Sequence, residues 1–176
     1  MRAAVAQTMR PDEAVYRFPG MVTVGVPLLA IFLRAFLPIK FHFMAWFELP
    51  LLVVIYFAVS RRSPVAGLLT GAAIGLVQDS MMGTPWPIGI NGIAETIVGY
   101  VASSLSVKID TDNPGSRALI TFGFYLLHQF VFETVARGMA RIEFGWEWHR
   151  VLLLGLANAV LAVVLFAFLD KFRQKA

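Results

Sequence analysis

The chain has 176 residues and a formal net charge of +4, and 58% of its residues are hydrophobic while only 15% are charged. Soluble domains carry about 25% charged residues, so this composition excludes an ordinary water-soluble domain and predicts a membrane protein. The basic residues are scattered between apolar runs, which argues against nucleic-acid binding, and the lack of cysteine excludes disulfides and thiolate metal sites.

A polar N-terminal tail, residues 1–19, precedes six apolar segments. Pro11, Asp12 and Glu13 interrupt the stretch in which a signal peptide would need its apolar core. A helix needs about 20 residues to cross ~30 Å of hydrocarbon, so the chain has room for six spans and no second folded domain. The predicted fold class is an all-α polytopic membrane protein, with one six-helix transmembrane domain over 20–170 and a basic tail over 171–176. We predict spans at about 20–38, 43–59, 65–82, 87–107, 117–137 and 150–169.

The distribution of basic residues predicts the orientation, because Lys and Arg in short loops are retained on the cytoplasmic side. One side of the six-span arrangement collects ten basic residues and the other side five. Among the five is Arg34, which lies near the end of its span and is expected to reach water by snorkelling. Both termini are therefore predicted to be cytoplasmic. The ten residues are Arg2, Arg10, Arg17, Arg61, Arg62, Lys108, Arg117, Lys171, Arg173 and Lys175.

Small residues recur at helical spacing in the third and fourth segments. In the third segment a glycine at every fourth position forms a row that ends at Asp79. Helices in lipid associate by close approach of their backbones, which glycine at this spacing permits. We therefore expect the two segments to pack along this row, with a coincidental row as the alternative, since glycine is frequent in membrane helices. The packing glycines are Gly67, Gly71, Gly75, Gly92 and Gly99.

Two acidic residues lie in this apolar region. Asp79 ends the third segment, and Glu95 lies in the fourth, one turn after Asn91. A charge at the centre of a membrane helix costs about 2.5–3.5 kcal/mol, so Glu95 and Asn91 should face protein or a wet pocket. Asp79 should be held by donors of the next turn, around Gly83 and Thr84. The acids either lock this turn, or form a docking surface, or serve catalysis, proton relay or substrate binding.

The remaining polar residues carry no metal or enzyme signature. Glu133 and Arg137 have the favourable order for an ion pair within one helix. The histidines lie in different segments, without the His-Glu-x-x-His spacing of a metal site. The phosphate-binding loop, the nucleophile elbow and the Gly-x-Gly-Asp of intramembrane aspartyl proteases are absent from the sequence. We therefore predict that the chain is not an enzyme and has no cofactor. The histidines are His42, His128 and His149.

In combination these motifs resemble the MreD family of bacterial rod shape-determining membrane proteins. The motif region covers about a quarter of the chain, and the length and the six-span layout are compatible over the whole. The turn is one residue longer here than the spacing typical of the family. The matching residues are Gly67 to Gly71, Gly75 to Asp79, Gly83-Thr84-Pro85, Pro87-Ile88-Gly89 and Gly99-Tyr100.

The resemblance implies a non-enzymatic scaffold of the cell-elongation machinery in the bacterial inner membrane. Its expected partner is MreC, in a complex with MreB, RodA and the transpeptidase of RodA, which supports side-wall peptidoglycan synthesis and rod shape. Membrane lipid is a further expected partner, and nucleic acid is not. The motif residues that could form an interface are Asp79, Gly83, Pro85, Gly89, Asn91 and Glu95.

Two other functions remain open. The family is similar in fold to the six-helix substrate-binding subunits of energy-coupling vitamin transporters, so a substrate-binding transport subunit is the alternative. It would need a cavity of about 300–1,000 Å³ that opens to one side, with Asn91, Glu95, His128 and Gln129 as candidate contacts. An intramembrane hydrolase would need Asp79 and Glu95 within hydrogen-bond reach of one water.

Overall fold

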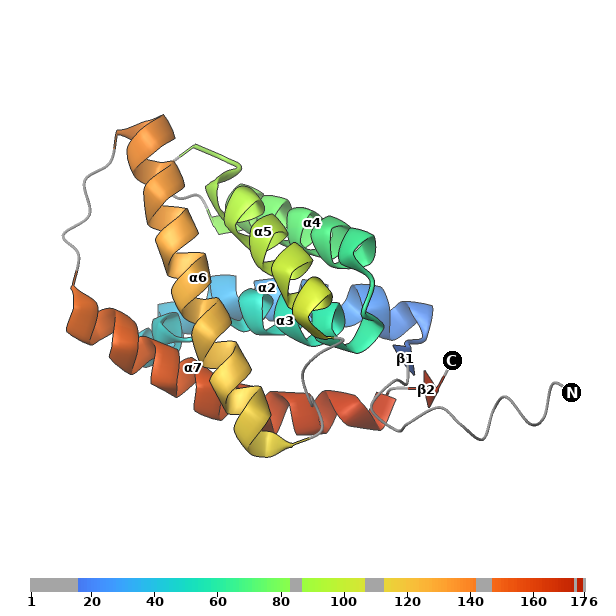
Figure 1. The fold of residues 1–176 in the computed structure, drawn as a ribbon. Helices are drawn as coiled ribbons and strands as arrows, with labels where there is room; N and C mark the ends of the chain where they lie inside the picture. The colour runs from blue at the N-terminus through green and yellow to red at the C-terminus, as the bar shows by residue number, and fades with distance from the viewer. Residues whose placement is uncertain (1–15, 83–86, 107–112, 142–146, 173, 176) are drawn as a thin grey trace, which may run out of the picture.

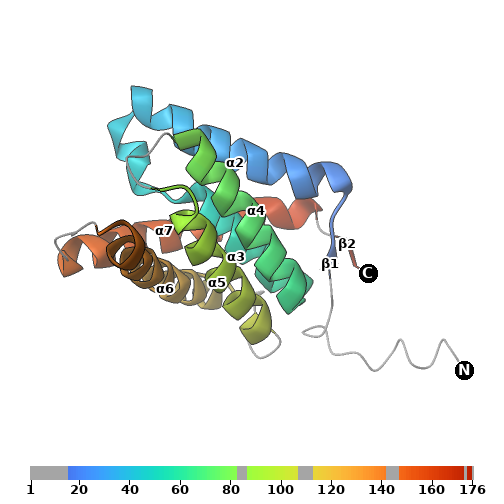
Figure 2. The same ribbon diagram turned by 90° about the horizontal axis from the view of Figure 1, so that it is seen from above.

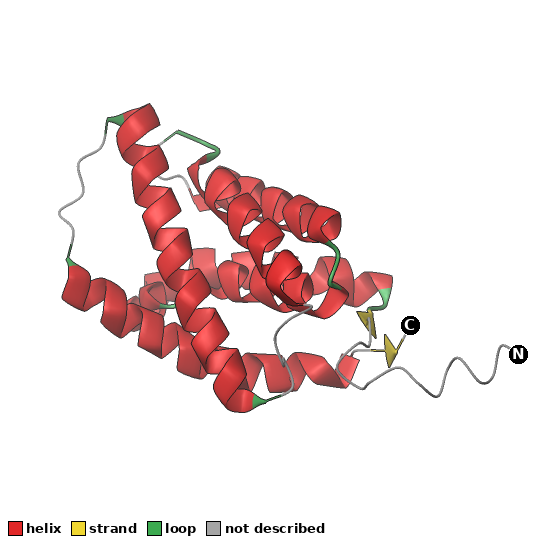
Figure 3. Ribbon diagram, viewed as in Figure 1, coloured by secondary structure: helices red, strands yellow, loops and turns green. Residues whose placement is uncertain are grey.

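The computed structural model describes residues 16–82, 87–106, 113–141, 147–172 and 174–175, and nearly all of them are helical (Figures 1 and 3). Two short 3-10 helices, η2 (His42–Trp46) and η4 (Asp170–Phe172), accompany the strands β1 (Tyr16–Arg17) and β2 (Gln174–Lys175). Apart from this strand pair, the prediction of an all-α fold is correct. The α-helices are α2 (Gly20–Lys40), α3 (Leu49–Arg61), α4 (Pro64–Met82), α5 (Ile90–Leu105), α6 (Pro114–Ala140) and α7 (Trp148–Leu169).

Each predicted segment contains one α-helix, but the helices differ in whether their length and composition suit a membrane span. Within the described ranges, α2, α6 and α7 are long and apolar enough to span by length and composition. The 27 residues of α6 extend about 40 Å, which is longer than the ~30 Å hydrocarbon core, so α6 can cross it with tilt or with its ends outside it. The side chains of Met21, Leu29 and Phe36 on α2 are exposed, as on a helix that faces lipid.

The central helix is α3, and it is shorter than predicted. Its 13 residues extend only about 20 Å, so it cannot cross the hydrocarbon core as a straight helix. Every residue from Pro50 to Ala58 is buried, because α3 contacts α2, α4, α5, α6 and α7. The expected span at 43–59 is therefore a 3-10 helix followed by a short helix in the protein core. Apolar composition did not distinguish burial in protein from burial in lipid.

The other helices surround α3 (Figures 1 and 2). The antiparallel pair α4 and α5 covers one side, α6 and α7 another, and α2 lies beside α4. At the end of the bundle that holds both chain termini, Arg117 of α6 forms a 2.7 Å ion pair with Asp170, just past α7. Tyr56 of α3 donates a hydrogen bond of 3.1 Å to the same carboxylate. These contacts tie three helices together at this end.

Local sequence explains where several helices begin and end. Arg62 adopts a left-handed conformation (φ 51°) that ends α3, and Pro64 begins α4 directly afterwards, where its missing N–H is not needed. Asn113 caps α6 by accepting a 2.8 Å hydrogen bond from the amide of Gly115. The tight turn at Arg62 and Ser63 keeps α3 and α4 adjacent.

The described segments nearest the two termini pair with each other. β1 and β2 are antiparallel, with Tyr16 opposite Lys175 and Arg17 opposite Gln174. The described parts of the two predicted tails are thus joined next to the first turn of α2 (Figure 1). An arrangement with both termini at one end of the bundle agrees with an even number of passes.

Candidate functional site

Glycines form the contact between α4 and α5. A Cβ atom added at Gly67 would collide with the carbonyl oxygen of Gly99, and one added at Gly71 would collide with that of Glu95. One added at Gly75 would lie 2.7 Å from the carbonyl oxygen of Asn91. The two backbones are therefore in direct contact over about two helical turns, at distances that no side chain other than hydrogen allows.

The second helix contributes its own small residues to this contact. Gly99 approaches the backbone of Gly67, and an added Cβ at Gly92 would lie 2.9 Å from the side chain of Leu76. Ser103 turns its hydroxyl back to the carbonyl of Gly99 at 2.8 Å, so its polar atom is satisfied within α5. The two rows of small residues face each other along the interface.

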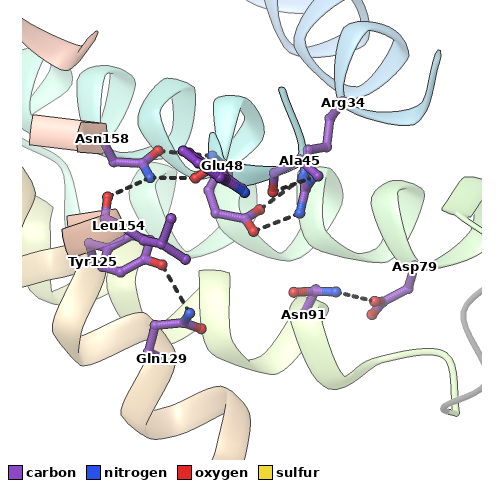
Figure 4. Close-up of polar contacts among 10 residues, drawn as sticks. Arg34, Ala45, Glu48, Asp79, Asn91, Tyr125, Gln129, Leu154 and Asn158 are labelled. Carbon is purple, nitrogen blue, oxygen red and sulfur yellow. Dashed lines mark hydrogen bonds and ion pairs between the residues drawn. The ribbon is translucent and has the colours of Figure 1, made fainter. Parts of the chain in front are cut away.

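Asp79 lies at the C-terminal end of α4, but its carboxylate binds the start of α5 (Figure 4). It accepts hydrogen bonds from the amides of Gly89 at 2.8 Å and Gly92 at 3.2 Å, and from the side-chain amide of Asn91 at 2.7 Å. Gly89, the N-cap of α5, has no side chain to bind the free amides of the first turn. Asp79 supplies that cap from a neighbouring helix, and its charge is favourable at the helix N-terminus.

The turn between these helices is described only in part. Gly83, Thr84 and Pro85, which include the donors expected for Asp79, lie outside the described residues. Gly89 adopts φ +112°, a left-handed backbone that favours glycine. Among the described donors, the start of α5 holds the Asp79 carboxylate.

Glu95 is buried near the middle of α5. Its side chain is 1% exposed, and neither carboxylate oxygen has a hydrogen-bond partner among the described residues. Asn91 is also buried, but it is engaged by Asp79. No hydrogen bond joins Asp79 to Glu95 in the described part of the chain, so the geometry gives no support to a shared catalytic water between them.

A polar network that the sequence reasoning missed holds the start of α3 (Figure 4). Arg34 of α2 binds the carboxylate of Glu48 through two nitrogens, at 2.8 and 3.2 Å, and also donates to the carbonyl of Ala45 at 3.0 Å. Arg34 was expected to snorkel to water. It is instead largely buried and paired, because its long side chain reaches Glu48 inside the bundle.

Asn158 of α7 completes the network. Its side-chain oxygen accepts a 2.8 Å bond from the Glu48 amide, and its nitrogen donates to the carbonyls of Trp46 and Leu154, each at 2.9 Å. The bonds to Glu48 and Trp46 satisfy backbone groups at the break between η2 and α3, while the bond to Leu154 stays within α7. An asparagine in the middle of an apolar segment was the sequence signal for this role.

Between α6, α7 and this network lies an open polar cleft of about 560 Å³, which includes Arg34, Glu48, Gln129, Glu133 and Arg150. Gln129 is the predicted transport contact that lines it, and its side chain donates to the Tyr125 hydroxyl at 3.1 Å. His128 is buried instead, without a hydrogen-bond partner among the described residues. Glu133 and Arg137 form the expected ion pair within α6, at 3.4 Å.

The described residues place no group of three or more His, Asp or Glu side chains where they could hold a metal ion. The chemistry available in the cleft is therefore that of paired charges, an amide and aromatic rings. Such a set can bind a polar ligand or a polypeptide segment.

Comparison with known families identifies the chain. The family model described as rod shape-determining protein MreD matches residues 16–176. The chain belongs to the MreD family. MreD membership implies a role in determining rod shape, and together with three long apolar helices it indicates a membrane protein. No curated protein and no solved structure matches the chain, so the likeness of MreD to transporter subunits stays an expectation from the resemblance.

Proposed function

We propose that this MreD-family chain is a non-enzymatic scaffold of the cell-elongation machinery, which binds MreC and supports side-wall peptidoglycan synthesis. The observation that carries the proposal is the family match over nearly the whole chain. The organisation of the molecule supports it, because the described residues lie almost entirely in one helical bundle. A protein of this build acts through the neighbours that it holds in the membrane. MreB, RodA and its transpeptidase are the further members of the proposed complex.

We place this bundle in the bacterial inner membrane as a multi-pass protein with both termini cytoplasmic. The excess of Lys and Arg at the end that holds the termini supports this orientation. The short α3 would be sheltered by the five helices that contact it, while α4 and α5 present apolar side chains such as Leu69 and Ile97 on the outside of the bundle.

Co-purification tests the scaffold. The tagged chain is extracted from native membranes in a mild detergent, and recovered proteins are identified by mass spectrometry. Recovery of MreC with the wild-type chain is the expected result. We expect Gly71→Leu, which breaks the α4–α5 contact, to lose MreC, while Gly123→Leu retains it, because no neighbouring atom lies within 4 Å of an added Cβ there. Failure of the folded wild-type chain to retain MreC would overturn the proposal.

The polar cleft supports a second candidate function, a substrate-binding subunit of a small-molecule transporter. Its volume of about 560 Å³ lies within the range of about 300–1,000 Å³ that is usual for ligand sites, and Gln129 lines it. Asn91 and Glu95 are not among the residues that line the cleft, which weakens this candidate.

Native mass spectrometry separates the two functions. A transport subunit would retain a small molecule that Arg150→Ala releases and Arg141→Ala does not, since Arg150 lines the cleft and Arg141 is exposed outside it. Recovery of an ATPase module in place of MreC would favour transport. Recovery of MreC with an empty cleft would favour the scaffold.

A further inference from the structure

A second hollow lies on the lipid-facing side of the bundle, between α2 and α4, with α3 as its floor. This α2–α4 groove has a volume of about 310 Å³ and is almost entirely apolar. Val24 and Leu28 form one wall and Leu69 and Val77 the other, and all four side chains are partly exposed. The two helices lie side by side and diverge toward the end that holds the chain termini (Figure 2).

One end of the α2–α4 groove is basic. Arg61, the last residue of α3, lines it, with its guanidinium 5.2 Å from the centre of the Phe57 ring. It donates one hydrogen bond, of 2.8 Å, to the Thr23 hydroxyl, and no carboxylate among the described residues pairs with it. A guanidinium has five N–H donors, so most of its donors are available to an anion. Arg62 follows it, and α4 begins two residues later, which adds positive potential.

The dimensions of the groove favour a lipid over a helix. Its lining on α2 runs from Thr23 to Ile31, which is about 12 Å along the helix axis and close to half of the ~30 Å hydrocarbon core. A transmembrane helix would need a track through both leaflets, whereas an acyl chain reaches through only one.

We propose that the α2–α4 groove binds one anionic phospholipid, with one of its two acyl chains along the apolar walls and its headgroup phosphate on Arg61. The Thr23 hydroxyl and the Phe57 ring hold the guanidinium at the level where the phosphate of that leaflet lies. Lipid would then fill the space between α2 and the α3–α4 core and hold α2 in place. The inference is independent of the proposed scaffold function.

The test uses the full-length protein in nanodiscs that contain equal amounts of phosphatidylglycerol and phosphatidylcholine. Native mass spectrometry after transfer to detergent measures which lipid is retained. We expect retention of phosphatidylglycerol over phosphatidylcholine, and a loss of about tenfold or more in Arg61→Gln, because a hydrogen bond to a charged group is removed. Arg141→Gln, at the opposite end of the bundle, is the matched control and should retain the lipid.

Two further variants keep the test decisive if Arg61→Gln unfolds. Ala73→Trp fills the groove and leaves Arg61 unchanged, so it should abolish retention. Thr23→Val removes the same hydrogen bond as Arg61→Gln but keeps the charge, so it should retain more lipid than Arg61→Gln.

Three results would overturn the proposal. The first is equal retention of both lipids by the wild-type protein. The second is displacement of the bound lipid by millimolar inorganic phosphate, which would indicate a free-anion site. The third is a photo-crosslinker at position 73 that captures a polypeptide from native membranes in place of lipid, which would indicate a partner helix in the groove.

Discussion

A single carboxylate, that of Asp79, links the end of α4 to the start of α5 through three hydrogen bonds. Asp79 stands where its own helix disfavours a negative charge, at the C-terminus, and is compensated by three donors from the start of α5. Gly89 needs its left-handed backbone and therefore has no side chain that could cap the helix. The two residues together replace the usual N-cap, in which one residue provides both the turn and the acceptor.

We predict that Asp79→Leu lowers the free energy of unfolding by at least about 3 kcal/mol, because it leaves buried amide donors without an acceptor. Asp79→Asn keeps one acceptor oxygen and should cost about 1–2 kcal/mol. Thermal and denaturant unfolding in detergent micelles measure both. Equal loss in the two variants would show that the charge itself, and not its hydrogen bonding, is what matters.

Asn158 has a comparable role just before α3, at the same end of the bundle as Asp79 (Figure 4). It is fully buried and bonds to the Glu48 amide and the Trp46 carbonyl just before α3, and also to the Leu154 carbonyl one turn earlier in α7. Asn158→Leu leaves the groups of Glu48 and Trp46 without this partner, and we expect it to lower the free energy of unfolding by about 2–4 kcal/mol. Leu156→Ala, at an exposed position on α7, serves as the control in the same unfolding experiment. A stable Asn158→Leu variant would mean that water replaces the amide.

The backbones of α4 and α5 are in direct contact at the glycines. This contact allows a test of whether the four-residue glycine spacing predicts how the two helices pack. At Gly71, a Cβ would collide with the backbone of Glu95, which cannot move without shifting the whole of α5. We therefore predict that Gly71→Leu lowers the unfolding temperature clearly, by overpacking worth at least about 1–3 kcal/mol. Gly123→Leu on α6 adds the same side chain in open space and should leave the temperature nearly unchanged. Similar unfolding temperatures for the two variants would contradict the packing argument.

The sequence predicted structure correctly where the pattern was local to one segment. It did not predict structure that depends on contacts with other helices. The four-residue glycine spacing and the terminal Asp79 pointed to the region in which α4 and α5 meet, because backbone contact requires the absence of side chains. The sequence did not predict that α3 is short and buried in protein, because an apolar run looks the same whether lipid or protein covers it. Arg34 and Glu48 lie 14 residues apart on different elements, so no periodicity could pair them.

The molecule as a whole has both termini at one end and the Arg34–Glu48–Asn158 network at the other (Figures 1 and 4). The end that holds the termini carries Arg61, Arg62 and Lys171, and the opposite end carries the polar cleft. Charge therefore defines an inside and an outside for the bundle, if positive residues are retained in the cytoplasm.

The natural lack of cysteine allows this orientation to be tested directly. We predict that Lys40→Cys, at the exposed end of α2, reacts with a membrane-impermeant maleimide in cells whose outer membrane has been permeabilised. Lys171→Cys, exposed beyond α7, should react only after the inner membrane is also opened. Both changes remove one lysine from an exposed site, so each serves as the control for the other. The reverse labelling pattern would invert the orientation, place the polar cleft in the cytoplasm and move the Arg61 end of the α2–α4 groove to the outer leaflet.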